Sequence, residues 1–399
     1  MIGTAEFIYS RDINGIYYIN ANMAAFNSRF TGADSRPRFT STAVNRINSN
    51  VSSAVVMKNQ DVGKYWHASA ALEKRFKTGF LKAAYSYGES KNTVDPGSIA
   101  FGSWNNNQHA GDGNNPGLGF SVSSPGHRVF AAGSFSKEYF KLGKTTVAFF
   151  WEGNQFNTSY TFGGDINNDG GTSNDLLYIH SSTSEMNFVP YTASGRTFTA
   201  AEQAQAWDAF INQDPYLSKN RGKYSERGGI FVPMVYRADV SLTQELFKNL
   251  GGKRHGLEIR ADVVNFMNLL NSDWGVGQRM VSNQPLIPAS AAQGGPVSAS
   301  GAPQYTLRQF NGALMTKSFE PTAGVGDAYD FRGRARNRRV VVADDVADQH
   351  HLRQRGALAL GDIADGAQIA LVKMLEAREQ PTTAAVSYTH LTPPPSAPV

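Results

Sequence analysis

The residues best suited to chemistry are four oxygen-bearing side chains in one short loop. Asp165, Asn167 and Asp169 are the first, third and fifth residues of DINNDG, which matches the first half of a calcium-binding loop. Calcium takes about six to eight oxygen ligands, and glycine at the sixth position permits the turn on which these side chains converge. The glutamate expected at the twelfth position is replaced by Leu176, and Asp175 beside it is the candidate substitute. The pattern predicts a calcium site formed by Asp165, Asn167, Asp169 and Asp175 that stiffens the loop.

An alternative for this loop requires no metal. Asn, Asp and Gly favour turns, because their side chains bond to the local backbone or tolerate left-handed conformations. Catalysis has less support, since none of the 8 histidines lies in a metalloprotease, nucleophile-elbow or phosphate-loop pattern. We expect no enzymatic activity and no cofactor other than the calcium ion of this loop.

Long strands are the elements that must position this loop. In segment 234–268, apolar and polar residues alternate in two runs on either side of the basic turn 248–255. A period of two indicates antiparallel strands with one apolar and one polar face. Each run has about 10 residues, the length that a tilted strand needs to cross a membrane. The same alternation predicts hairpins that pair 64–74 with 79–88 and 128–138 with 144–157, and Asn14-Gly15 predicts a further hairpin turn near the N-terminus.

Short turns alternate with long loops along the chain. The long polar segments are roughly 22–63, 89–126, 163–229 and 271–303. Loops of this length are uncommon in compact soluble domains, and long loops opposite short turns are typical of outer-membrane barrels. Asp239, Glu258 and Asp262 would then face the lumen, with Arg237 and Arg260 as cross-strand partners. Aromatic girdles are predicted from Tyr17, Tyr65, Trp66, Tyr85, Tyr87, Tyr139, Trp151 and Tyr236. The alternative is a large soluble β-sandwich or propeller.

One helix is predicted inside the third long loop. Thr199 and Glu202 have the spacing of a capping box, and Trp207, Phe210 and Ile211 form an apolar stripe behind it. We expect this stripe to pack the loop onto its own barrel rim. The alternative is that the stripe contacts a ligand at the mouth of the barrel.

Composition excludes several classes of protein. Charged residues make up 18% of the 399 residues, below the usual value of about 25%. No run of about 18 apolar residues predicts a transmembrane helix, and cysteine is absent, which excludes disulfides and thiolate metal sites. The net charge is +5, but the basic residues do not form a stripe along the sequence, so we expect no nucleic-acid partner. The N-terminus shows no signal peptide, so the protein is expected to be cytoplasmic or to begin further upstream.

Three segments together carry a family resemblance. They are YTFGGDINNDG (160–170) with NDLLYI (174–179), YLSKNRG (216–222) and LEIRADVVNFMNLLN (257–271). In this order they resemble the C-terminal half of the β-barrel of TonB-dependent outer-membrane receptors of the Oar-like type. The resemblance covers about 1–327 and implies a barrel of about 22 strands, an N-terminal plug domain and a TonB box, and often a carboxypeptidase-regulatory-like β-sandwich upstream.

The resemblance also implies location and function. The expected fold is all-β, an antiparallel transmembrane β-barrel that is partial and open, with about 8–10 strands, long outer loops, one short loop helix and a non-barrel C-terminal tail. Its place is the outer membrane of a Gram-negative-type bacterium, in contact with lipid. The family moves a large ligand (a peptide, protein or glycan) with energy from the TonB complex, which binds the absent N-terminal region, so this fragment alone should be inactive. The alternative is a surface or secreted β-rich ligand-binding protein without transport.

The composition changes near residue 328. No Phe, Tyr or Trp occurs from 332 to 386, and 385–392 resembles translated sequencing adapter of the kind seen in metagenomic fragments. We therefore predict that 328–399 is a frameshifted or chimeric tail and that the strand expected beside 257–263 is missing. The alternative is a genuine extension with a helix over 363–378.

Overall fold

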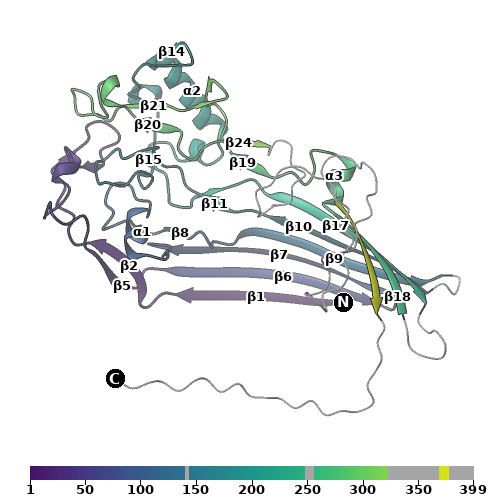
Figure 1. Ribbon diagram of the computed structural model, residues 1–399. Coiled ribbons are helices and arrows are strands. Elements are labelled where there is room, and N and C mark those ends of the chain that lie inside the picture. Colours follow the sequence, from purple (N-terminus) through teal and green to yellow (C-terminus); the bar gives the residue numbers. More distant parts are fainter. Residues whose placement is uncertain (140–142, 248–255, 322–367, 377–399) are drawn as a thin grey trace, which may run out of the picture.

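The computed structural model describes residues 1–139, 143–247, 256–321 and 368–376, and these residues are dominated by antiparallel β-structure (Figure 1). One large sheet has the order β1-β6-β7-β9-β10-β17-β18-β25, with β8 paired to β7. Its strands are β1 (Ile2–Arg11), β6 (Lys64–Phe76), β7 (Gly79–Asn92), β8 (Gly119–Phe120), β9 (Gly126–Glu138), β10 (Lys144–Asn154), β17 (Val235–Phe247), β18 (Gly256–Val264) and β25 (Gln368–Glu376). The expectation of an all-β, antiparallel chain is confirmed.

Smaller elements fill the long connections. The helices are α1 (Ala100–Asn105), α2 (Ala200–Gln213) and α3 (Phe266–Leu270). The short strands are β2 (Gly15–Asn20), β3 (Ser28–Arg29), β4 (Pro37–Arg38), β5 (Val55–Gln60), β11 (Asn157–Thr158), β12 (Tyr178–Ile179), β13 (Tyr191–Ala193), β14 (Arg196–Phe198), β15 (Lys223–Tyr224), β16 (Ile230–Phe231), β19 (Gln278–Met280), β20 (Leu286–Pro288), β21 (Tyr305–Leu307), β22 (Gln309–Phe310), β23 (Ala313–Leu314) and β24 (Phe319–Pro321). No helix among the described residues is long and apolar enough to cross a membrane.

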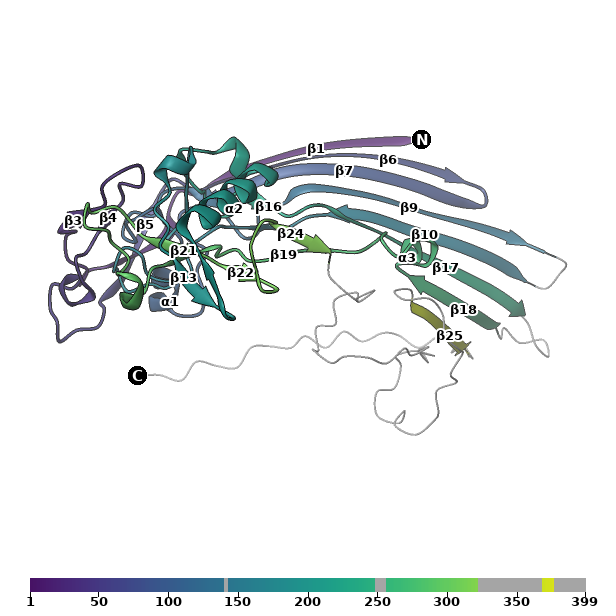
Figure 2. The same cartoon turned by 90° about the horizontal axis from the view of Figure 1, so that it is seen from above.

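The large sheet is an antiparallel meander whose connections differ in length between its two ends. Strands β6 and β7 are joined by only Lys77 and Thr78, whereas 12–63, 93–125 and 155–234 connect β1 to β6, β7 to β9 and β10 to β17. Successive connections of an antiparallel meander alternate between the two ends of the sheet, so all three long ones lie at the same end (Figures 1 and 2). We call these three connections, together with 265–321, the cap.

The two faces of the large sheet differ in chemistry, although the more polar face also carries Phe130 and Phe150. Register partners across adjacent strands share a face. One row across β9, β10, β17 and β18 reads Phe135, Val147, Leu242 and Ala261. The neighbouring row, on the other face, reads Ser136, Thr146, Thr243 and Arg260. The predicted hairpins of 64–88, 128–157 and 234–268 are therefore confirmed, while the turn 248–255 lies outside the described residues.

The apolar face has no protein cover in the described part of the chain. Phe135 is 52% exposed, Val147 44% and Leu242 46%, although all three are large apolar side chains in the middle of strands. The buried apolar cluster consists entirely of residues from the cap. The sheet thus contributes nothing to the core that a soluble protein would build on it.

Aromatic side chains form a row on the apolar face near the cap. The ring of Trp66 lies 5.3 Å from that of Tyr87, which stacks on His127 at 4.4 Å, and Trp151 stacks on Tyr236 at 5.6 Å. Among the residues predicted for girdles, Tyr85 also lies on this face. The remaining three lie elsewhere, because Tyr65 is on the polar face, Tyr17 belongs to β2, and Tyr139 follows β9 at the opposite end.

The prediction of a hairpin at Asn14 and Gly15 is wrong. Strand β1 pairs with β6 over ten register positions, and β2 turns away to pair with β5. The chain only bends at Ile13 and Asn14, and the Asp12 backbone N–H donates to Gly63 O at 2.9 Å. The longer ladder with β6 outweighs the local turn preference.

The C-terminal region differs from expectation where it is described. Residues 368–376 form β25, which pairs antiparallel with β18, so the edge expected to be open carries a strand and the alternative helix over 363–378 is not formed there. An unpaired strand edge presents N–H and C=O groups to any extended segment. The remainder of 328–399 lies outside the described residues, and its assignment as a frameshifted or chimeric tail stays a prediction.

Helix α2 organises the core of the cap. Its predicted capping box is confirmed, with Thr199 accepting from the Glu202 backbone N–H and Glu202 accepting from that of Thr199. Trp207, Phe210 and Ile211 are completely buried. They pack with side chains from distant parts of the cap, chiefly Tyr160, Phe162, Leu177, Ile179, Leu217, Leu286 and Leu307. The stripe therefore serves packing within the cap, and it is not available to a ligand.

His180 makes the cap core sensitive to pH. Trp207 Nε1 donates to His180 Nδ1 at 3.0 Å, and His180 Nε2 faces the hydroxyl of Tyr305. Burial lowers the pKa of His180 to about 4. Since the unfolded histidine binds its proton near pH 6.5, the unfolded state holds more protons between these values, so stability rises with pH through this window and is complete above it.

Acidification from pH 6.5 to 4 should therefore lower the free energy of unfolding of the cap by about 3 kcal/mol, because His180 takes up its proton more readily in the unfolded state. Hydrogen exchange of the α2 amides, corrected for intrinsic rates, measures the loss. Asp165 and Asp175 have raised pKa values and act in the opposite direction, so the effect is read as the difference between wild type and His180→Gln. A variant with the same pH dependence as wild type would contradict this prediction.

Candidate functional site

The loop 165–175 contains the side-chain-to-backbone hydrogen bonds that Asp and Asn favour in turns. The carboxylate of Asp165 accepts the backbone N–H groups of Asp169 at 3.1 Å and Gly170 at 2.8 Å. Asn167 Oδ1 accepts the Asp169 N–H at 2.9 Å. Gly170 has φ +101°, a conformation that L side chains rarely adopt. Glycine is therefore required at the sixth position of the loop.

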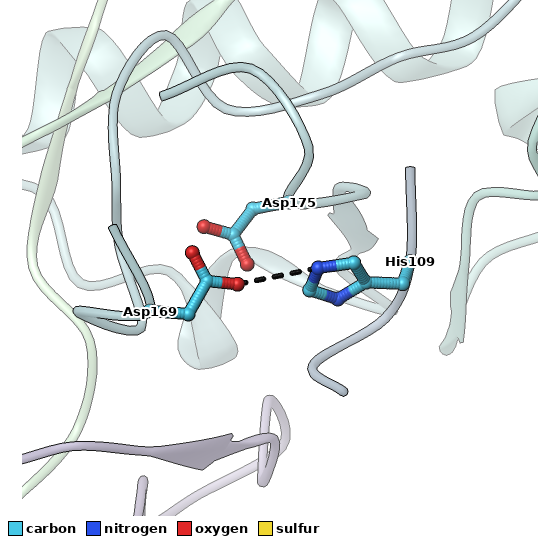
Figure 3. Close-up of side chains that lie close together, drawn as sticks. All are labelled: His109, Asp169 and Asp175. Carbon is cyan, nitrogen blue, oxygen red and sulfur yellow. Dashed lines mark ion pairs between the residues drawn. The ribbon is translucent and has the colours of Figure 1, made fainter. Parts of the chain in front are cut away.

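Two carboxylates of the loop meet a histidine from another connection. The Asp169 and Asp175 carboxylates and the His109 imidazole each place one atom within 4.8 Å of the others (Figure 3). His109 Nε2 lies 3.2 Å from Asp169 Oδ2. The side chains of His109 and Asp169 are 1% and 3% exposed, and Asp175 is completely buried. The site is therefore closed to bulk water.

The protonation of His109 follows from its second nitrogen. The backbone N–H of Gly111 donates to His109 Nδ1 at 3.1 Å, so Nδ1 carries a lone pair and no proton. The proton must then be on Nε2, because a neutral imidazole carries one proton. His109 is accordingly a neutral donor to Asp169, and its only available lone pair is already used by Gly111.

One arginine partly compensates the carboxylates. Arg36 is 1% exposed, and it donates to Asp34 at 3.0 Å, to Asp175 Oδ1 at 3.3 Å and to the Leu176 carbonyl at 2.8 Å. Asp175 Oδ2 accepts the Ile166 N–H at 3.1 Å. One buried cation thus pairs with two carboxylates, those of Asp34 and Asp175, while Asp169 and Asp165 add negative charge around Asp175.

The pKa values reflect this excess of negative charge. Burial raises the pKa of Asp175 to about 7 against the pull of Arg36, and burial raises the pKa of Asp165 to about 6. For Asp169 burial also acts upward, but hydrogen bonds from His109 and the loop hold its pKa below the usual value. Ionised carboxylates are therefore unfavourable at two of the three positions.

The four predicted residues come together only in part. Asp169 and Asp175 meet beside His109, whereas Asp165 accepts backbone N–H groups of the turn, and the amide of Asn167 donates to the Gly111 carbonyl and the Asp169 carboxylate. Sequence reasoning missed His109, Arg36 and the amide of Asn174. His109 and Arg36 come from other connections of the cap, and no spacing or period in the sequence links them to the loop.

Charges on the polar face of the sheet form a separate group. Arg260 Nε donates to Asp262 Oδ1 at 2.9 Å along the same strand, which differs from the cross-strand pairing predicted for Arg260. Asp239 accepts the Asn265 N–H at 2.7 Å. Arg237 lies opposite Glu152 in the register.

Comparison with protein-family models, curated proteins and solved structures gave no match. Functional conclusions therefore rest on the sheet and the cap.

Proposed function

We propose that this chain is the C-terminal part of the β-barrel of a TonB-dependent outer-membrane receptor of the Oar-like type. The observation that carries the proposal is the uncovered apolar face of the large sheet. Lipid is the one medium in which such a face is stable without a second protein layer, because apolar side chains facing water in a patch of this size favour association. The polar face, with Arg237, Asp239 and Arg260, would then line the lumen.

Strand length and connection length support the same proposal. The seven strands from β1 to β18 have 9 to 14 residues, against about 9–11 for a strand that spans a bilayer. All three long connections lie at one end, as outer loops do in outer-membrane barrels. Under the proposal, the row of Trp66, Tyr87, Trp151 and Tyr236 beside these loops would form an interfacial girdle.

Two of the three segments that carry the resemblance have a physical role in the cap. Tyr160, Phe162, Ile166 and Leu177 are buried to 5% exposure or less, and Leu217 is completely buried. The segments 160–179 and 216–222 therefore help to build the core of the cap, whereas 257–264 belongs to β18 of the sheet. Under the proposal, a peptide, protein or glycan ligand passes through the complete barrel with energy from TonB, and this chain alone does not transport.

The alternative, a surface or secreted ligand-binding β-protein, requires a second layer over the apolar face. No described element supplies one. Reading the DNA upstream of the Met1 codon tests the transport part of the proposal. We expect an in-frame plug domain and TonB box. A stop codon followed by a signal peptide directly before Met1 would overturn it.

A further inference from the structure

Two buried amide oxygens beside the loop 165–175 have no hydrogen-bond partner. Asn174 Oδ1 and Asn45 Oδ1 are among the buried side-chain atoms without a partner in the described part of the chain. Asn174 is 4% exposed and Asn45 6%. Leaving a buried polar atom unpaired is unfavourable, because the atom has lost its hydrogen bonds to water. Asn45 Nδ2 donates to the Asn168 carbonyl at 3.0 Å, so this amide lies directly against the loop.

The side-chain amide of Asn174 lies between a carboxylate acceptor and an imidazole N–H donor, and one orientation of the amide cannot satisfy both. Its Nδ2 lies 3.2 and 3.4 Å from the Asp169 carboxylate oxygens and 3.1 Å from His109 Nε2. Because His109 carries its proton on Nε2, two donors face each other there. Turning the amide over would give His109 an acceptor, but it would place Oδ1 against the carboxylate of Asp169. Neither orientation satisfies the site.

A cation bound to the carboxylates removes the conflict. With positive charge at the centre, Asn174 Oδ1 can turn toward the same point as the oxygens of Asp169 and still lie beside the Nε2 proton of His109. The charge balance agrees, since the carboxylates of Asp34, Asp169 and Asp175 are at most 4% exposed and Arg36 pairs with only two of them, Asp34 and Asp175. Buried charges of one sign normally require a paired charge or a metal.

We propose that the loop 165–175 binds calcium through oxygen atoms alone, with Asp169, Asp175 and the amide oxygen of Asn174 as ligands and with Asp165 holding the turn through backbone N–H groups. The chemistry of the donors selects the ion. His109 has no lone pair to offer, because Gly111 occupies Nδ1 and Nε2 is protonated. The remaining donors are carboxylate and amide oxygens, which suit a hard cation such as Ca²⁺ and not the transition metals that prefer imidazole.

The ion would tie three connections of the cap into one body. Asp165, Asp169 and Asp175 belong to the third connection, His109 to the second, and Arg36 and Asn45 to the first. Calcium at their junction would fix the outer loops relative to one another. This site is independent of the transport proposal, since it depends on the cap and not on what faces the sheet.

Hydrogen exchange of the full chain in detergent micelles tests the site, with CaCl₂ compared against EDTA. With a dissociation constant near 0.1 mM, about 1 mM calcium should slow exchange of the 160–180 segment about tenfold. Asp169→Asn should abolish this response, and Asp273→Asn, an exposed aspartate outside the cap core, should retain it. Magnesium should have a smaller effect, because it demands stricter octahedral geometry.

His109→Gln separates the proposal from a transition-metal site. We expect this variant to keep the calcium response, because His109 is not a ligand. The proposal is overturned if wild type does not respond to calcium, if Asp273→Asn loses the response together with Asp169→Asn, or if zinc replaces calcium and His109→Gln abolishes the effect. None of these outcomes bears on the lipid-facing sheet, so failure here is distinguishable from failure of the transport proposal.

Discussion

Replacing Leu242 with arginine is expected to lower the free energy of unfolding of the chain in lipid vesicles by about 2–4 kcal/mol. Leu242 lies near the middle of β17, on the apolar face, and is 46% exposed. Under the proposal this exposed surface faces the hydrocarbon core, where a guanidinium loses its hydration. Guanidine titration of vesicle-refolded protein measures the change. In a soluble protein the same substitution at an exposed position would be within about 0.5 kcal/mol of neutral.

Ser241→Arg is the matched control for this prediction. Ser241 is the adjacent residue on the polar face, where its register partners are Ala148 and Asp262. An arginine there meets a carboxylate in an aqueous lumen, and we expect little change in unfolding free energy. Equal effects of Leu242→Arg and Ser241→Arg would contradict the assignment of the two faces.

Replacing Trp207 with alanine is expected to destabilise the cap by about 3–5 kcal/mol, the usual cost of removing a large buried aromatic side chain. Trp207 is completely buried, stacks on Phe210 with 5.1 Å between ring centroids, and donates to His180. Removing it leaves both a cavity and an unpaired nitrogen. Hydrogen exchange should show faster exchange in α2 and in 160–180 while the amides of β9 and β10 remain protected.

Gln205→Ala on the same helix is the control. Gln205 is exposed, and alanine has at least its helix propensity, so we expect a change within about 0.5 kcal/mol. If Trp207→Ala unfolded the sheet and the cap together, the separation of the cap core from the sheet would be wrong. If Trp207→Ala were as mild as Gln205→Ala, the central place of α2 in the cap would be wrong.

Local pattern predicts the sheet well where pairing is local. Alternation over the hairpins β6–β7, β9–β10 and β17–β18 identifies both the pairing and the two faces, since each short turn leaves the strands little choice of partner. The pairing of β1 could not be found in this way. Its partner β6 begins 52 residues after β1 ends, and the attractive turn at Asn14 and Gly15 indicated the wrong neighbour.

In the candidate site, too, the sequence predicts contacts within one loop but not contacts between distant segments. The turn of 165–170, in which Asp165 accepts the N–H groups of Asp169 and Gly170, follows from residue types at fixed spacing. The approach of His109 to Asp169, by contrast, joins two different connections of the cap. The unpaired oxygen of Asn174 emerges only when the loops are packed. Such contacts leave no periodic signal in the sequence.

The most direct test of the central claim is to measure which face of the sheet touches lipid. The chain contains no cysteine, so single cysteines at Leu242 and Ser241 can be labelled with bimane and examined in vesicles that contain brominated lipid. We predict strong quenching at position 242 and weak quenching at 241, because successive side chains of a strand point to opposite faces. Equal quenching at the two positions, or stronger quenching at 241, would contradict a lipid-facing apolar surface and with it the proposed outer-membrane barrel.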